Sequence, residues 1–134
     1  MPIEIVKRYS RNDLKRRSDA LFAFGDNMAR QGYGGQAAAC RGEPNAVGIP
    51  TKWRPSNEPG AFFSDTDYPA VMPAIVASFV RLADHIRAGG DVIWPADGVG
   101  TGLADLPARA PRIATLIARC RERLDECGNV GIPT

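Results

Sequence analysis

Residues 20–40 read ALFAFGDNMARQGYGGQAAAC, and this stretch carries the clearest indication of fold class. Its first part, Ala20–Phe24, is a short continuous apolar run ended by Gly25, which is typical of a strand buried on both faces of a sheet. Its last part, Gly34–Cys40, opens with glycine and continues in alanine, which predicts a small-residue helix packed closely on that sheet. A buried strand followed by such a helix indicates an α/β fold.

The same alternation continues on both sides of this stretch. Ile3–Arg8 alternates apolar and polar residues, which predicts an outer strand, and the polar, basic connector Ser10–Arg17 has room for one or two helical turns. We expect Pro50 to stop the strand before it and Gly128 to end the last helix. The other elements predicted from apolar spacing are strands at Asn45–Ile49 and Asp91–Pro95 and helices at Ala74–Ala88 and Ala110–Cys127.

These elements predict a three-layer α/β/α sandwich with a mostly parallel sheet, forming a single domain over residues 1–134. Ligands in such folds bind beyond the carboxyl ends of the strands. Two glycine clusters follow predicted strands, Gly25–Gly35 after Phe24 and Gly98–Gly102 after Pro95. Both clusters are therefore expected at the ligand-binding edge of the sheet.

Composition argues against several other classes of protein. A net charge of +2 does not by itself indicate a nucleic-acid or membrane partner, and no uninterrupted apolar run is long enough to span a bilayer. Charged residues near the N-terminus argue against an export signal, so we expect a cytoplasmic protein. Three cysteines without a CxxC motif are expected to be reduced and structural. The one histidine, His85, is expected to be a solvated surface residue, and we expect no metal or cofactor.

The second cluster, Gly98–Gly102, has glycine at every second position. This pattern lets the backbone approach a ligand and aim successive N–H groups into one concavity, which forms a nest for a phosphate. The alternative is a tight turn from strand to helix that needs only flexible residues. Neither cluster has the Gly-Lys-Ser/Thr of a Walker loop, and the dinucleotide-binding fingerprint fits poorly.

The first cluster places Asp26 and Asn27 at a predicted strand end, ahead of Gly32, Gly34 and Gly35. An amide at a strand end is able to hydrogen-bond a sugar hydroxyl or to orient a water. A glycine-lined helix N-terminus is able to host a diphosphate through its free N–H groups. The alternative is that Asp26 and Asn27 only cap the next segment.

Two further segments each allow two interpretations. Thr51, Lys52 and Trp53 follow one another after a strand and would hold a ribose, a phosphate and a stacked base; alternatively, Trp53 pins the loop on the core. The basic segment Lys7–Arg17 would suit nucleic acid if aromatic residues were interleaved with its charges. Tyr9 is its single aromatic residue, which favours a solvated face.

Both glycine-containing stretches resemble those of the macrodomain, the α/β module that binds ADP-ribose. Asn27–Ala37 (NMARQGYGGQA) is similar to the family's asparagine, glycine run and small residues that open a helix. Pro95–Pro107 (PADGVGTGLADLP) is similar to its late strand and phosphate loop. The wider pattern FGDN…GYGGQAA…EPNAVGIPTK also resembles a group of bacterial and phage proteins of macrodomain type. The family's aspartate for the adenine amino group has no clear match, which leaves the base open.

The resemblance implies that Asn27 faces the distal ribose, while the first glycine run lines the diphosphate and the second cluster closes the other side. With the residue patterns above, it gives the set of expected ligand contacts. These are Gly25, Gly32, Gly34, Gly35, Thr51, Lys52, Asp97, Gly98, Val99, Gly100, Thr101 and Gly102.

The expected function is binding of ADP-ribose or a related nucleotide diphosphate, free or attached to a protein or nucleic acid. Hydrolysis of an ADP-ribosyl linkage would depend on Asn27 and Asp26, on the substrate's own phosphate, or on Asp97 beside the second cluster. Asp26 and Asp97 are the candidate bases, whereas an asparagine only orients a water. We therefore expect binding ahead of turnover. The alternative is a non-catalytic interaction protein that binds nucleic acid through Lys7–Arg17 and keeps its glycine loops for packing.

Overall fold

The computed structural model of the chain describes residues 2–130. Its centre is a sheet of four parallel strands in the order β1-β4-β2-β3, which confirms the predicted α/β class and parallel sheet. The strands are β1 (Ile3–Val6), β2 (Leu21–Asn27), β3 (Ala46–Lys52) and β4 (Val92–Pro95).

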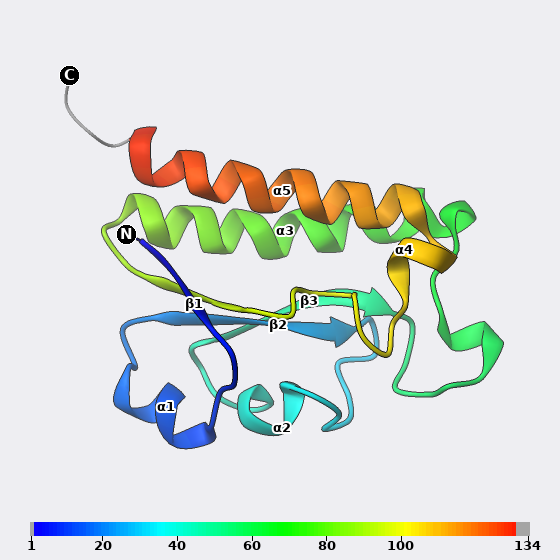
Figure 1. Cartoon of the computed structure of the whole chain (residues 1–134), viewed down its shortest axis with the longest axis horizontal. Helices are drawn as coiled ribbons and strands as arrows, with labels where there is room; N and C mark the ends of the chain where they lie inside the picture. Colours follow the sequence, from blue (N-terminus) through cyan, green and yellow to red (C-terminus); the bar gives the residue numbers. More distant parts are fainter. Residues whose placement is uncertain (1, 131–134) are drawn as a thin grey trace.

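Helices cover both faces of this sheet and make the domain a three-layer sandwich (Figure 1). Helices α1 and α2 pack on one face, and the two long helices α3 and α5 lie side by side on the other. The short helix α4 follows the second glycine cluster. The helices are α1 (Arg11–Arg16), α2 (Ala37–Cys40), α3 (Tyr68–Arg87), α4 (Leu106–Arg109) and α5 (Pro111–Val130).

Strand β2 is buried from both sides, as its apolar run predicts. Phe22 and Phe24 belong to the core cluster that includes the buried residues of α1 and α2. Leu21 and Ala23 belong to the cluster formed with α3 and α5. Successive side chains of a strand point to opposite faces, so a continuous apolar run supplies both layers of the core.

Strands β2 and β3 run further than the sequence predicts. β2 continues through Gly25, and β3 continues through Pro50, which pairs with Asp26 in parallel register. Proline has no N–H to donate, but β3 is an edge strand with a neighbour on one side only, where proline is tolerated. The expectation that Gly25 and Pro50 stop these strands is wrong, and the longer β2 includes Asp26 and Asn27.

The two short helices differ in how well the sequence predicts them. The connector Ser10–Arg17 does contain a helix, α1, whose N-terminus is closed by a capping box between Ser10 and Asp13. The predicted helix Gly34–Cys40 is reduced to the four residues of α2, because Gly35 adopts a left-handed φ of +56°. The first glycine cluster therefore forms a loop rather than the start of a helix.

The long helices α3 and α5 both exceed their predicted bounds. α3 begins at Tyr68 instead of Ala74. Pro69 is tolerated in its first turn, because N–H groups there have no acceptor within the helix and proline therefore loses no hydrogen bond. α5 continues through Gly128 to Val130, so the expectation that Gly128 ends it is wrong.

Among the described residues, the segment Asp65–Arg87 is the one helical stretch whose length and mean hydropathy of 1.2 would suit a membrane span. Its apolar face is used inside the domain, because Val71, Ile75 and Leu82 are fully buried in the core cluster shared with α5. This is the pattern of a core helix in a globular domain.

The burial of His85 differs from the sequence prediction, whereas the cysteines agree with it. His85 is half-buried rather than solvated, since its imidazole lies over Gly90, where an added Cβ would be 2.3 Å from Nε2. The three cysteines are free, as predicted, with Cys40 and Cys127 buried and Cys120 half-buried. Burial raises the pKa of the Cys40 thiol to about 12, so this side chain behaves as a small hydrophobe.

Candidate functional site

A cavity of about 710 Å³ opens at the carboxyl edge of the sheet, between the two glycine clusters. The ends of β2 and β3 contribute to its lining, together with the connections that follow β2, β3 and β4. It thus lies at the edge where the sequence predicts a ligand. The predicted site residues that line it are Gly25, Asp26, Asn27, Gly32, Gly34, Gly35, Thr51, Lys52, Gly98, Gly100 and Gly102.

The first glycine loop, residues 28–36, joins β2 to α2. Its turns place three residues in the left-handed region, Arg30 (φ +55°), Gly32 (φ +88°) and Gly35 (φ +56°). A Cβ on Gly32 would also lie 2.8 Å from Cβ of Pro55, so glycine is required there. At Gly34, by contrast, an added Cβ would meet no atom within 4 Å. The fold therefore does not explain the glycine at position 34.

The second glycine loop, residues 96–105, joins β4 to α4. Gly98 and Gly100 have left-handed φ values of +81° and +82°, and a Cβ on Gly100 would lie 2.4 Å from Cδ1 of Leu106. An added Cβ on Gly102 would meet nothing within 4 Å. A tight turn thus accounts for Gly98 and Gly100 and leaves Gly102 unexplained.

Both loops present runs of backbone N–H groups that have no acceptor within the described part of the chain. These runs are residues 32–36 and residues 99–104. The N–H groups next to these runs do have acceptors. The Gln31 N–H donates to Oδ1 of Asn27 (3.3 Å), and the Asp105 N–H donates to the Gly102 carbonyl (3.0 Å). Successive free N–H groups on glycine-rich backbone form concavities that bind anions. Helix α2 adds little dipole to this, because it has only four residues.

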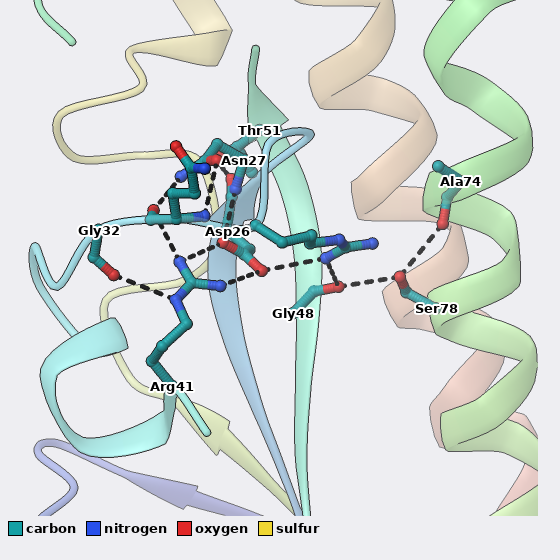
Figure 2. A network of polar contacts seen from close by, with 10 residues as sticks. Asp26, Asn27, Gly32, Arg41, Gly48, Thr51, Ala74 and Ser78 are labelled. Atoms are coloured by element: carbon teal, nitrogen blue, oxygen red, sulfur yellow. Dashed lines mark hydrogen bonds and ion pairs between the residues drawn. The ribbon is translucent and has the colours of Figure 1, made fainter. Parts of the chain in front are cut away.

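Asp26 and Asn27 lie at the end of β2, and their side chains are bonded to neighbouring protein groups (Figure 2). The Asp26 carboxylate accepts hydrogen bonds from Arg41 and Arg30 and from the Asn27 N–H. The Asn27 amide donates to the Gln31 carbonyl (2.7 Å), and its oxygen accepts from the Gln31 N–H. Asn27 therefore organises the start of the first glycine loop, as the capping interpretation predicts.

Thr51 and Lys52 line the cavity from the end of β3. The Thr51 hydroxyl is buried and donates to the Asp26 carbonyl at 3.0 Å. The Lys52 ammonium donates to the Ser56 carbonyl and lies 4.5 Å from the centre of the Phe62 ring. Burial, with a smaller effect of a nearby arginine, holds the pKa of Lys52 below its usual range. Lys52 gives this wall of the cavity a cation.

Four residues singled out in the sequence are not among those lining the cavity. Val99 is buried in the core, and the Thr101 hydroxyl donates to the carbonyl of Asp97, whose side chain is exposed. Trp53 donates its indole N–H to Asp67 at 3.2 Å and packs edge-to-face on Phe63. The interpretation in which Trp53 pins its loop on the core is therefore confirmed.

Several lining residues were not identified as site residues from the sequence, among them Arg41, Tyr33 and Leu103. Tyr33 and Leu103 are large apolar side chains that are 68% and 73% exposed, and each lies within or beside a glycine cluster. A large apolar residue next to a glycine cluster is visible in the sequence, so Tyr33 and Leu103 could have been identified as candidate ligand contacts. Arg41 has no comparable signal, because the contact with Asp26 joins distant positions in a chain rich in arginine.

The basic segment Lys7–Arg17 is partly neutralised. Arg11, Arg16 and Arg17 each form an ion pair with an acidic neighbour. Tyr9, its single aromatic residue, is buried and donates its hydroxyl proton to a backbone carbonyl of β4. This arrangement favours a solvated face over a nucleic-acid footprint.

Within residues 2–130, no group of three or more His, Cys, Asp or Glu side chains is placed to hold a metal ion. Residues 4–120 match the model of a family of unknown function, DUF7831, and the chain belongs to that family. No curated protein and no solved structure matches the chain. The resemblance to macrodomains stays a prediction.

Proposed function

We propose that the cavity between the two glycine loops binds ADP-ribose or a related nucleotide diphosphate. The observation that carries this proposal is the pair of N–H runs at residues 32–36 and 99–104, from two loops that line one cavity. A diphosphate offers several acceptor oxygens to such donors, and each hydrogen bond to a charged group contributes about 1.5–3 kcal/mol. Lys52 supplies a positive charge in the same lining.

The cavity also suits the remainder of such a ligand. Tyr33 and Leu103 come from different loops and expose apolar surface at the cavity, where a sugar or a base would cover it. Ser56 and Asn57 add polar groups from the connector after β3. A lining of apolar surface with a few polar groups is usual for small-molecule sites.

Binding is proposed ahead of hydrolysis. Asp26 is engaged by two arginines, and the Asn27 amide is bonded on both of its polar atoms to Gln31. Asp97 is not part of the cavity lining. None of these groups is therefore poised to accept a proton from a water held in the cavity.

A thermal-shift screen tests the proposal. A ligand that binds only the folded state at a concentration of about 100 Kd adds about 2.7 kcal/mol to the free energy of unfolding. For a domain of this size, we expect ADP-ribose to raise Tm by several degrees, ADP to raise it less, and ribose 5-phosphate to have the smallest effect. Stabilisation by an oligonucleotide but by no nucleotide diphosphate would support the interaction-protein alternative instead.

A further inference from the structure

An ion cluster built around the buried carboxylate of Asp26 lies beside the first glycine loop (Figure 2). The Asp26 side chain is 3% exposed, and its carboxylate faces the guanidinium of Arg41 in a two-point pair, with N–O distances of 2.9 and 2.7 Å. Arg30 donates to the same carboxylate at 3.1 Å, and the Asn27 N–H donates at 2.8 Å. The carboxylate oxygens are thereby occupied by donors from three residues.

Arg41 also reaches into the loop itself. Its Nε donates to the Gly32 carbonyl (3.1 Å), and its Nη2 donates to the Gln31 carbonyl (2.9 Å). One guanidinium thus binds a carboxylate at the end of β2 and two successive peptide groups of the glycine loop. Lysine could not reproduce this arrangement, because its ammonium is a point donor without the planar fork.

These contacts fix the direction of the loop's N–H groups. In a trans peptide, the carbonyl of one residue and the N–H of the next point in opposite directions. With the carbonyls of Gln31 and Gly32 held on Arg41, the N–H groups of Gly32 and Tyr33 point away from it. They are the first two members of the free run at residues 32–36.

Gly48 of β3 leaves space for this cluster, and its carbonyl links the cluster to α3 through hydrogen bonds. A Cβ on Gly48 would lie 2.4 Å from Oδ2 of Asp26 and 2.9 Å from Nη1 of Arg30, so β3 requires glycine there. The Gly48 carbonyl accepts hydrogen bonds from Arg30 (2.8 Å) and from Ser78 of α3 (3.0 Å). Arg30 itself has a left-handed φ of +55°, a conformation that costs about 1–2 kcal/mol. The cluster therefore holds a strained turn in place.

We infer that Arg41 and Asp26 are positioning residues, which hold the first glycine loop in its ligand-accepting shape before a nucleotide diphosphate binds. This inference rests on the proposed function for its ligand, but its structural half concerns the free protein. It assigns Asp26 a role as an anchor rather than a proton acceptor. The charge of Arg41 is directed at Asp26 and not at the ligand.

The alternative is that Arg41, which lines the cavity, binds the phosphates directly. The two roles predict opposite effects for Asp26→Asn. If Arg41 is a direct ligand, removal of the competing carboxylate charge frees it and strengthens binding of an anion. If Arg41 is a positioning residue, Asp26→Asn weakens binding, as Arg41→Gln does, and the double variant is no weaker than either single variant.

The experiment combines two measurements on the full chain. Backbone NMR order parameters of residues 31–35 are measured in the free protein, and ADP-ribose affinity is measured by calorimetry. In Arg41→Gln, we expect the loop values to fall from about 0.85, typical of rigid backbone, to below about 0.6. We expect affinity to fall at least tenfold. Arg41→Lys retains the charge beside Asp26, guards against loss of folding, and is expected to behave like Arg41→Gln.

Arg17→Gln is the matched control, because Arg17 pairs with two carboxylates, those of Glu4 and Asp91, and none of its hydrogen bonds reaches the loop or Arg41. It should leave loop order and affinity unchanged. Unchanged loop order in Arg41→Gln and Arg41→Lys would overturn the inference, and so would tighter binding by Asp26→Asn. If the wild-type protein binds no nucleotide diphosphate, but the Arg41→Lys variant has a less ordered loop than the wild type, the proposed ligand is wrong and the positioning role stands.

Discussion

Replacing Gly34 by valine is expected to weaken nucleotide binding at least about 30-fold while leaving the fold intact. Gly34 has no left-handed φ, and an added Cβ would meet no protein atom within 4 Å. A substitution in open space away from packing contacts usually changes the free energy of unfolding by no more than about 0.5 kcal/mol. The new side chain can therefore obstruct little except a ligand.

The expected loss of affinity follows from the N–H groups that surround position 34. A valine side chain there would displace a phosphate from one or two of the N–H groups in the run at residues 32–36. With each charge-assisted hydrogen bond contributing about 1.5–3 kcal/mol, the loss is about 2–5 kcal/mol, or at least about 30-fold in Kd.

Gly100→Val provides the contrast. Its Cβ would lie 2.4 Å from Cδ1 of Leu106, and its φ of +82° is left-handed. Backbone strain of about 1–2 kcal/mol and overpacking of about 1–3 kcal/mol predict a loss of about 2–5 kcal/mol in the free energy of unfolding. Position 100 therefore tests the fold, and Gly102→Val, in open space, is the matching probe of the second loop.

Urea denaturation and calorimetric titration with ADP-ribose separate these effects. Gly34→Val and Gly102→Val should unfold like the wild type and bind at least about 30-fold more weakly. Wild-type affinity in either variant, with its fold retained, would remove the corresponding loop from the site.

Three other predictions concern single side chains. Lys52→Met should weaken ADP-ribose binding about tenfold or more, because it removes a positive charge from the cavity. Binding by the wild type should weaken as the pH rises through the lowered pKa of Lys52, since deprotonation removes the same charge. An identical pH profile in Lys52→Met and the wild type would contradict this. In the native protein, a thiol reagent should modify half-buried Cys120 well before buried Cys40 and Cys127. Reaction of all three thiols should require denaturation. Rapid loss of all three thiols in the native protein would be inconsistent with the structure. Tyr9→Phe removes a hydroxyl that donates to a buried carbonyl and should lower the free energy of unfolding by about 1 kcal/mol in urea titrations, whereas no change would show that this hydrogen bond contributes nothing.

The layers of the fold could be predicted from local patterns. The apolar run at Ala20–Phe24 serves both core clusters, and the apolar spacing in α3 and α5 reflects one buried face on each helix. Element ends were harder to predict, because they depend on neighbours in space. Pro50 continues a strand only because β3 lies at the edge of the sheet, which the sequence near Pro50 does not reveal.

The site was predictable in its backbone and less so in its side chains. Glycine clusters after strands mark both loops, since close backbone approach needs glycine. The partner of Asp26 was not predictable, because fourteen arginines are possible partners and nothing local distinguishes Arg41. The same long-range contact changes the interpretation of Asp26, which the sequence suggests as a base and the structure surrounds with cations.

We propose that the two runs of free backbone N–H groups bind one nucleotide diphosphate. An NMR titration of the isotope-labelled protein with ADP-ribose observes these groups directly. We expect saturable shifts of the amide resonances of residues 32–36 and residues 99–104, with one common Kd, while the amides of residues 7–17 stay unchanged. Shifts confined to residues 7–17, or no shift in either loop at millimolar ADP-ribose, would contradict it.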